Sequence, residues 1–127
     1  MLKLILNYWQ NNALFWALIV TLGITIGSLI NPSYIAYPGV KISDKVLHFG
    51  AYIVLILSWL VYVKKNRVSI NHWLVLIYLV VFGIIIELSQ RYLTQSRTGE
   101  IWDIMSNTLG LFMGLMIFNF WIKKFIH

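Results

Sequence analysis

The feature of this sequence that most constrains its fold is a series of four long apolar runs separated by short polar segments. The runs cover about residues 13–30, 44–63, 72–92 and 101–122. Each is close to the ~20 residues that an α-helix needs to cross a bilayer. Hydrophobic residues make up 60% of the chain and charged residues only 11%, whereas about a quarter of the residues in soluble proteins are charged. We therefore predict an all-α integral membrane bundle of four transmembrane helices in a single domain, residues 1–127.

The N-terminal segment resembles a signal peptide, because Met1-Leu2-Lys3 is followed by apolar residues. No small-x-small cleavage site follows it, so we expect the segment to be retained with the first span. Helices are preferred to strands as spanning elements because an open sheet edge leaves backbone groups without hydrogen bonds in lipid.

The basic residues indicate how the chain is oriented. Six Lys and Arg residues fall on the side of the two termini, and four fall on the other side. The six are Lys3, Lys64, Lys65, Arg67, Lys123 and Lys124, and the four are Lys41, Lys45, Arg91 and Arg97. By the positive-inside rule we expect both termini to be cytoplasmic.

The formal net charge of +6 could suggest a nucleic-acid partner. The cations, however, form short clusters between apolar runs, without the basic stripe and interleaved aromatic residues of a nucleic-acid site. We expect membrane lipids as partners and no nucleic acid. The sequence has no cysteine, which excludes disulfides and thiolate metal sites.

The few acidic residues gather on one side of the predicted membrane. All four carboxylates lie where a span begins or ends on the outer side: Asp44, Glu87, Glu100 and Asp103. An ionisable group at membrane depth costs several kcal/mol unless it meets another polar group or water. We therefore predict that these groups face one another or an outward-facing polar cleft.

Helical spacing gives each of the last three spans a polar face at this side. The pairs at i,i+3 or i,i+4 spacing are Asp44 with His48, Glu87 with Gln90 and with Arg91, and Asp103 with Asn107. Acids next to a histidine suit acid–base chemistry, and guanidinium groups suit phosphate or carboxylate. The candidate catalytic residues are His48, Glu87, Asp103 and Asp44, and the candidate substrate-binding residues are Arg97, Gln90, Asn107 and Arg91.

Structural roles are open for the same residues. Glu87 could form an ion pair with Arg91 or Arg97, and His48 could be a packing residue. Asn107 could cross-link helices by hydrogen bonds. The small-x3-small step of Gly110 and Gly114 predicts close approach of the last span to a neighbour. His72 and His127 have no acidic neighbour and receive no role.

A divalent cation is compatible with the acidic residues, because oxygen ligands suit Mg²⁺ or Mn²⁺ and one imidazole admits Zn²⁺. The ligands would be Asp44, His48, Glu87 and Asp103. No recognised metal-binding spacing is present, so the sequence assigns no metal ligand and leaves the cofactor unknown.

The sequence resembles the VanZ-like family of small bacterial membrane proteins over its last three spans. The motifs that carry the resemblance are Asp44-Lys45-x2-His48-x3-Tyr52, Glu87-x2-Gln90, and Arg97-x5-Asp103-x3-Asn107-x2-Gly110-x3-Gly114. The resemblance implies a multi-pass protein of the bacterial cytoplasmic membrane. The family is named for a protein linked to low-level teicoplanin resistance, so it also implies a lipid-linked envelope precursor or a glycopeptide as partner, without defining an activity.

These observations favour a protein that acts on or binds an anionic, lipid-linked envelope molecule. Whether it is an enzyme is left open, because the same groups could bind a headgroup or hold a partner without making or breaking a bond. A scaffold whose polar cluster only holds helices or a partner together is the alternative. Transport is disfavoured because four spans show no internal repeat, and a homo-oligomer is compatible with the sequence.

Overall fold

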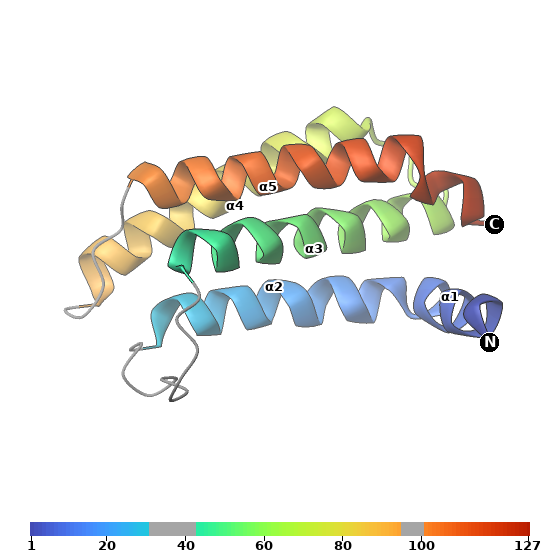
Figure 1. The fold of residues 1–127 in the computed structure, drawn as a ribbon, viewed down its shortest axis with the longest axis horizontal. Helices are drawn as coiled ribbons and strands as arrows, with labels where there is room; N and C mark the ends of the chain where they lie inside the picture. The colour runs from blue at the N-terminus through green and yellow to red at the C-terminus, as the bar shows by residue number, and fades with distance from the viewer. Residues whose placement is uncertain (31–42, 95–100) are drawn as a thin grey trace.

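The computed structural model describes residues 1–30, 43–94 and 101–127, and within these ranges the chain is helical with no strand (Figure 1). Four long helices lie side by side along the molecule: α2 (Ala13–Leu29), α3 (Asp44–Lys65), α4 (His72–Leu93) and α5 (Ile101–Phe120). The shorter α1 (Leu2–Asn11) lies at the beginning of α2, and a short 3₁₀ helix, η2 (Ile122–Phe125), follows α5. The all-α prediction is confirmed.

Three helices, α3, α4 and α5, are each long and apolar enough to cross a membrane. The pair of α1 and α2 passes the same test only when taken together, and the two helices are bent by 77°. The described structure thus holds three spanning helices, or four when the bent pair is counted as one broken span. The predicted boundaries agree with the observed ones within two residues at each end.

The bend at Asn12 was not predicted. The Asn12 side chain donates a hydrogen bond to the Tyr8 carbonyl over 2.9 Å, and it shares this acceptor with its own backbone N–H, which lies 3.2 Å from the same oxygen. Asparagine favours this kind of local bond over the helix interior. The apolar residues of α1 therefore form a helix of their own, in a different direction from α2.

Helix α3 lies at the centre and packs against α2, α4 and α5. Its approach to α5 is close because Gly110 and Gly114 present no side chain. A Cβ atom on Gly110 would overlap the Phe49 carbonyl oxygen, and one on Gly114 would lie 3.1 Å from the Ile53 carbonyl oxygen. The predicted small-x3-small contact is confirmed, and α3 is the neighbour.

The buried core is apolar and the outer surface is apolar too. Leu55, Leu60 and Phe118 have no exposed surface, whereas Ile77 and Ile85 on α4 are more than half exposed. A helix that is apolar all round is typical of a membrane span, because its outer side faces lipid. Buried polar residues such as Glu87, Gln90 and Asn107 are exceptions in this apolar structure.

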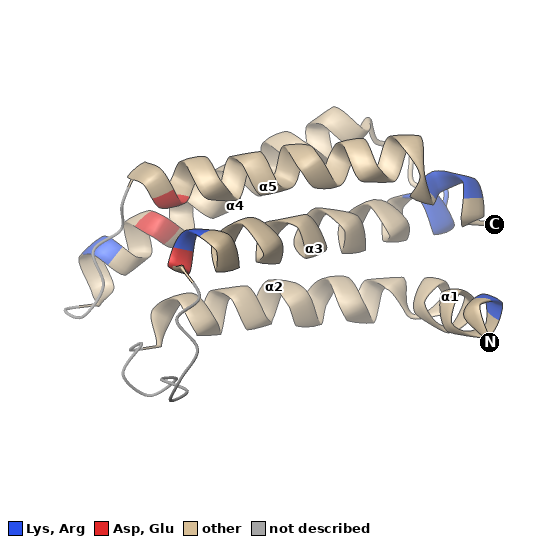
Figure 2. Ribbon diagram, in the orientation of Figure 1, with Lys and Arg blue, Asp and Glu red and all other residues tan. Residues whose placement is uncertain are grey.

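Both termini lie at one end of the bundle, and the three acidic residues that the structure describes, Asp44, Glu87 and Asp103, lie at the other (Figures 1 and 2). The terminal end is held by side-chain bonds: Gln10 Nε2 donates to the Phe125 carbonyl and Lys65 Nζ to the His127 carbonyl, each over 2.9 Å. That both termini share a side agrees with the predicted topology. Which side is cytoplasmic stays a prediction from the charge distribution.

Candidate functional site

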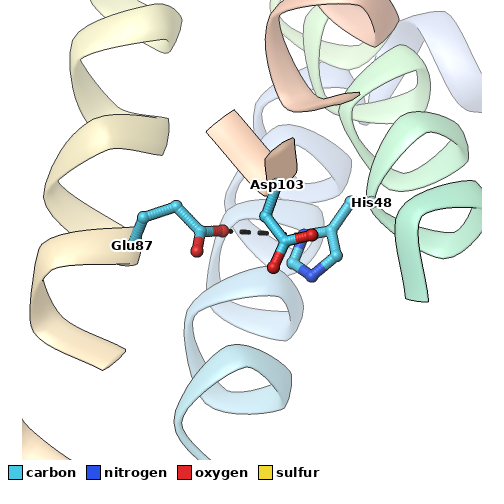
Figure 3. A group of neighbouring side chains, drawn as sticks. All are labelled: His48, Glu87 and Asp103. Atoms are coloured by element: carbon cyan, nitrogen blue, oxygen red, sulfur yellow. Dashed lines mark ion pairs between the residues drawn. The ribbon is translucent and has the colours of Figure 1, made fainter. Parts of the chain in front are cut away.

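The acidic end of the bundle contains a polar cluster contributed by three helices, and we define it as His48, Glu87, Asp103 and Asn107. Figure 3 shows the first three of these side chains. His48 comes from α3, Glu87 from α4, and Asp103 and Asn107 from α5. His48 lies four residues from the start of α3 and Glu87 six from the end of α4. At 1.5 Å per residue these side chains start about 6–9 Å inside the helix ends.

Asn107 links the three helices at this level. Its Oδ1 lies 3.1 Å from His48 Nδ1, and its Nδ2 donates to Glu87 Oε1 over 3.2 Å. Glu87 and Asn107 are each only 2% exposed. The predicted helix cross-link by Asn107 is confirmed, and it passes through the histidine and the acid that the sequence singled out.

His48 and Glu87 also form an ion pair when the imidazole is protonated, with 3.8 Å between Nδ1 and Oε1. This separation is longer than a hydrogen bond, so Asn107 makes the shorter contacts. The expected ion pair of Glu87 with Arg91 is not observed among the described residues, where Arg91 is exposed near the end of α4. Arg97 lies outside the described residues.

Asp103 forms the outer edge of the cluster. It is 9% exposed, and its Oδ1 lies 3.6 Å from Nζ of Lys45, whose side chain is 47% exposed. Oδ1 accepts no hydrogen bond within the described part of the chain. From the sequence, Lys45 was used only to predict the orientation of the chain in the membrane, although it belongs to the Asp44-Lys45-x2-His48 motif. In the structure it is the counter-charge of the buried Asp103.

Asp44 does not join the cluster. It is the first residue of α3 and is exposed, one turn further out than His48 on the same helix. The i,i+4 spacing of Asp44 and His48 predicted that both residues would belong to the site. It did not take into account that Asp44 stands at the very start of α3, where the side chain is exposed. A catalytic role for Asp44 stays a prediction.

Gln90 makes a different contact from the one expected. Its Nε2 donates to the Ser28 carbonyl over 2.8 Å, and the residue is 2% exposed. The bond ties the last turns of α4 to the end of α2. Gln90 therefore positions helices around the cluster, and its predicted contact with substrate remains untested.

Tyr52 is a residue of this region that the sequence analysis gave no role. It follows His48 by one helical turn, is 1% exposed, and places its ring against Gly83, where an added Cβ would lie 3.1 Å from Tyr52 Cε1. Its hydroxyl has no hydrogen-bond partner among the described residues. The i,i+4 spacing from His48 was the signal that could have identified it.

The opposite end of α4 carries a similar histidine–asparagine pair. His72 Nδ1 lies 3.0 Å from Asn119 Oδ1, and its ring meets Phe118 edge-on at 5.3 Å. This pair fixes the start of α4 against α5. Asp44, Glu87 and Asp103 all lie at the other end (Figure 2), so the acids distinguish the cluster from this structural pair.

The comparisons with known proteins agree with the motifs. The sequence model described as VanZ/LLP1 matches residues 2–122. This match includes the N-terminal helices, for which the motifs gave no resemblance. No curated protein and no solved structure matches the chain. Because the match takes in nearly the whole sequence, the chain belongs to the VanZ-like family.

Proposed function

We propose that this protein binds an anionic, lipid-linked molecule of the bacterial envelope at the end of the bundle that carries the polar cluster, and acts on it there. The observation that carries the proposal is Glu87, a 2%-exposed carboxylate connected through Asn107 to a histidine on a third helix. An acid at membrane depth is by default a functional residue, because an apolar side chain would pack there without the cost of burying charge.

The surroundings of the cluster support an anionic ligand. Lys45 and Arg91 are both exposed at this end. His48 and Glu87 start about 6–9 Å inside the helix ends, a depth at which headgroups and acyl chains meet, and Asp103 lies nearer the end of its helix. A phosphate or carboxylate held by the cations would lie close to His48 and Asp103. These groups can then donate or accept a proton at the ligand.

The proposed class of ligand and the proposed location rest on the resemblance to the family. Its name links it to teicoplanin resistance, so we propose a cell-wall precursor or surface lipid as ligand and a contribution to glycopeptide resistance. The protein would lie in the cytoplasmic membrane with the cluster facing outward, as the positive-inside rule requires.

A screen of phosphate-bearing envelope lipids tests the proposal. Purified protein in nanodiscs is incubated with each lipid, binding is measured by titration, and products are detected by mass. We expect saturable binding of at least one lipid, and Glu87→Gln should abolish product formation while largely preserving binding. Saturable binding without any product would limit the function to binding, and no binding of any lipid would refute the proposal.

A scaffold is the second candidate, and two bonds favour it. Asn107 to Glu87 joins α5 to α4, and Gln90 to Ser28 joins α4 to α2. If the cluster only holds helices, Glu87→Gln should preserve every function, because a glutamine can still accept the Asn107 bond. Activity or binding that depends on the carboxylate charge distinguishes the first candidate from this one.

A further inference from the structure

We propose that His48, Glu87 and Asp103 bind a divalent transition-metal ion, Mn²⁺ or Zn²⁺, with the Asn107 amide oxygen as a fourth donor. One ligand atom from each of the first three residues lies within 4.8 Å of the others. The three come from α3, α4 and α5, so an ion would join all the helices that span on their own (Figure 3).

The spacing of the donors suits a shared ion. Two donors on one ion at about 2.1 Å lie about 3.0 Å apart at a right angle and about 4.2 Å apart when opposite. His48 Nδ1 lies 3.1 Å from Asn107 Oδ1 and 3.8 Å from Glu87 Oε1. A direct charge-assisted hydrogen bond between His48 and Glu87 would have a length of about 2.8 Å. The observed 3.8 Å is longer, so the two atoms lie near a common point without being bonded to each other.

The charges of the cluster are also compatible with a cation. Glu87 is almost fully buried, and Asp103 is 9% exposed with an Oδ1 that accepts no hydrogen bond from the described residues. The ammonium group near Asp103 belongs to Lys45, at 3.6 Å on a side chain that is 47% exposed. Two carboxylates within reach of one imidazole give the site the negative charge that a divalent ion prefers.

The donor set selects the class of ion. Two carboxylates and an amide oxygen suit hard ions such as Mg²⁺ and Mn²⁺, but imidazole nitrogen favours the transition metals. Binding requires a neutral His48 whose Nδ1 lone pair points at the ion. His48 Nδ1 and Asn107 Oδ1 would then each bind the metal, and the hydrogen bond between these two atoms would be lost. The inference shares the cluster with the proposed function but does not rest on it, because ion binding needs no lipid.

Metal binding is measured on the full chain in nanodiscs after treatment with a chelator. Free Mn²⁺ is followed by electron paramagnetic resonance during titration, and Zn²⁺ by elemental analysis after equilibrium dialysis. We expect about one ion per chain, and an affinity at least ~10-fold lower in His48→Ala and in the isosteric Asp103→Asn. His72→Ala, which removes the histidine–asparagine contact at the other end of the bundle, is the matched control and should bind as wild type does.

Spectroscopy on the wild-type protein keeps the test independent of how the variants fold. Bound Mn²⁺ should show coupling to one imidazole nitrogen. The proposal is overturned if the wild type binds no ion, if bound Mn²⁺ shows no nitrogen coupling, or if folded Asp103→Asn binds as tightly as wild type. Ion binding without lipid binding would refute only the proposed function, and lipid binding without ion binding would refute only the metal site.

Discussion

Replacing Gly110 with alanine should separate α5 from α3 and disturb the polar cluster. The added Cβ would overlap the carbonyl oxygen of Phe49, a backbone atom that cannot move aside as a flexible side chain can. Phe49 follows His48 directly, and Asn107 precedes Gly110 by one helical turn. Moving α5 away from α3 at Gly110 should therefore lengthen the 3.1 Å contact between His48 and Asn107. Overpacking of a well-packed site costs about 1–3 kcal/mol, and we expect G110A to lose that much stability.

The assay is reversible unfolding in mixed micelles, followed by helix content, together with nuclear magnetic resonance of the His48 ring. Gly50→Ala is the matched control, because Gly50 lies next to Phe49 on α3 and an added Cβ there meets nothing within 4 Å. Its expected effect is neutral or stabilising by up to ~1 kcal/mol, from helix propensity alone. If G110A were as stable as G50A with an unchanged His48 signal, the close packing of α3 and α5 would not be what positions the cluster.

Three further changes probe single contacts. Gln90→Ala should lower the stability in the same unfolding assay by about 0.6–1.7 kcal/mol, because it removes the bond to the Ser28 carbonyl; an unchanged stability would contradict this. Tyr52→Phe should change stability by less than ~1 kcal/mol, because the hydroxyl has no partner among the described residues, and a larger loss would reveal one. Asn12→Leu should reduce the 77° bend, measured as a longer distance between spin labels at the far ends of α1 and α2. An unchanged distance would show that packing sets the bend.

The helices were predictable because membrane spans obey a simple rule of length and apolarity. The starts of α3 and α4 at Asp44 and His72 follow directly from where the polar segments stop. The 77° bend between α1 and α2 was not predictable in the same way, because an apolar sequence does not indicate the direction of the helix axis. It depends on one side-chain bond at Asn12, a local competition that composition does not register.

The cluster was predictable in part. Alternating helix direction brings His48, Glu87 and Asp103 to one level, and this inference needs only the order of the spans. The same inference placed Asp44 with them, but Asp44 is exposed at the first residue of α3. Which acid meets which cation depends on the rotation of each helix and on where the helix ends, so the pairing of Lys45 with Asp103 was not predicted.

The two histidine–asparagine pairs allow the structural and functional parts of the cluster to be separated. His72 with Asn119 and His48 with Asn107 have nearly equal distances, 3.0 and 3.1 Å, and each joins a helix to α5. The first pair needs no acid to do this, so holding helices together does not explain why Glu87 is buried beside the second. A buried carboxylate is costly in a membrane, and a neutral glutamine could accept the Asn107 bond that joins α5 to α4 equally well. What the acid adds is charge at a fixed point, which is what binding a cation or moving a proton requires.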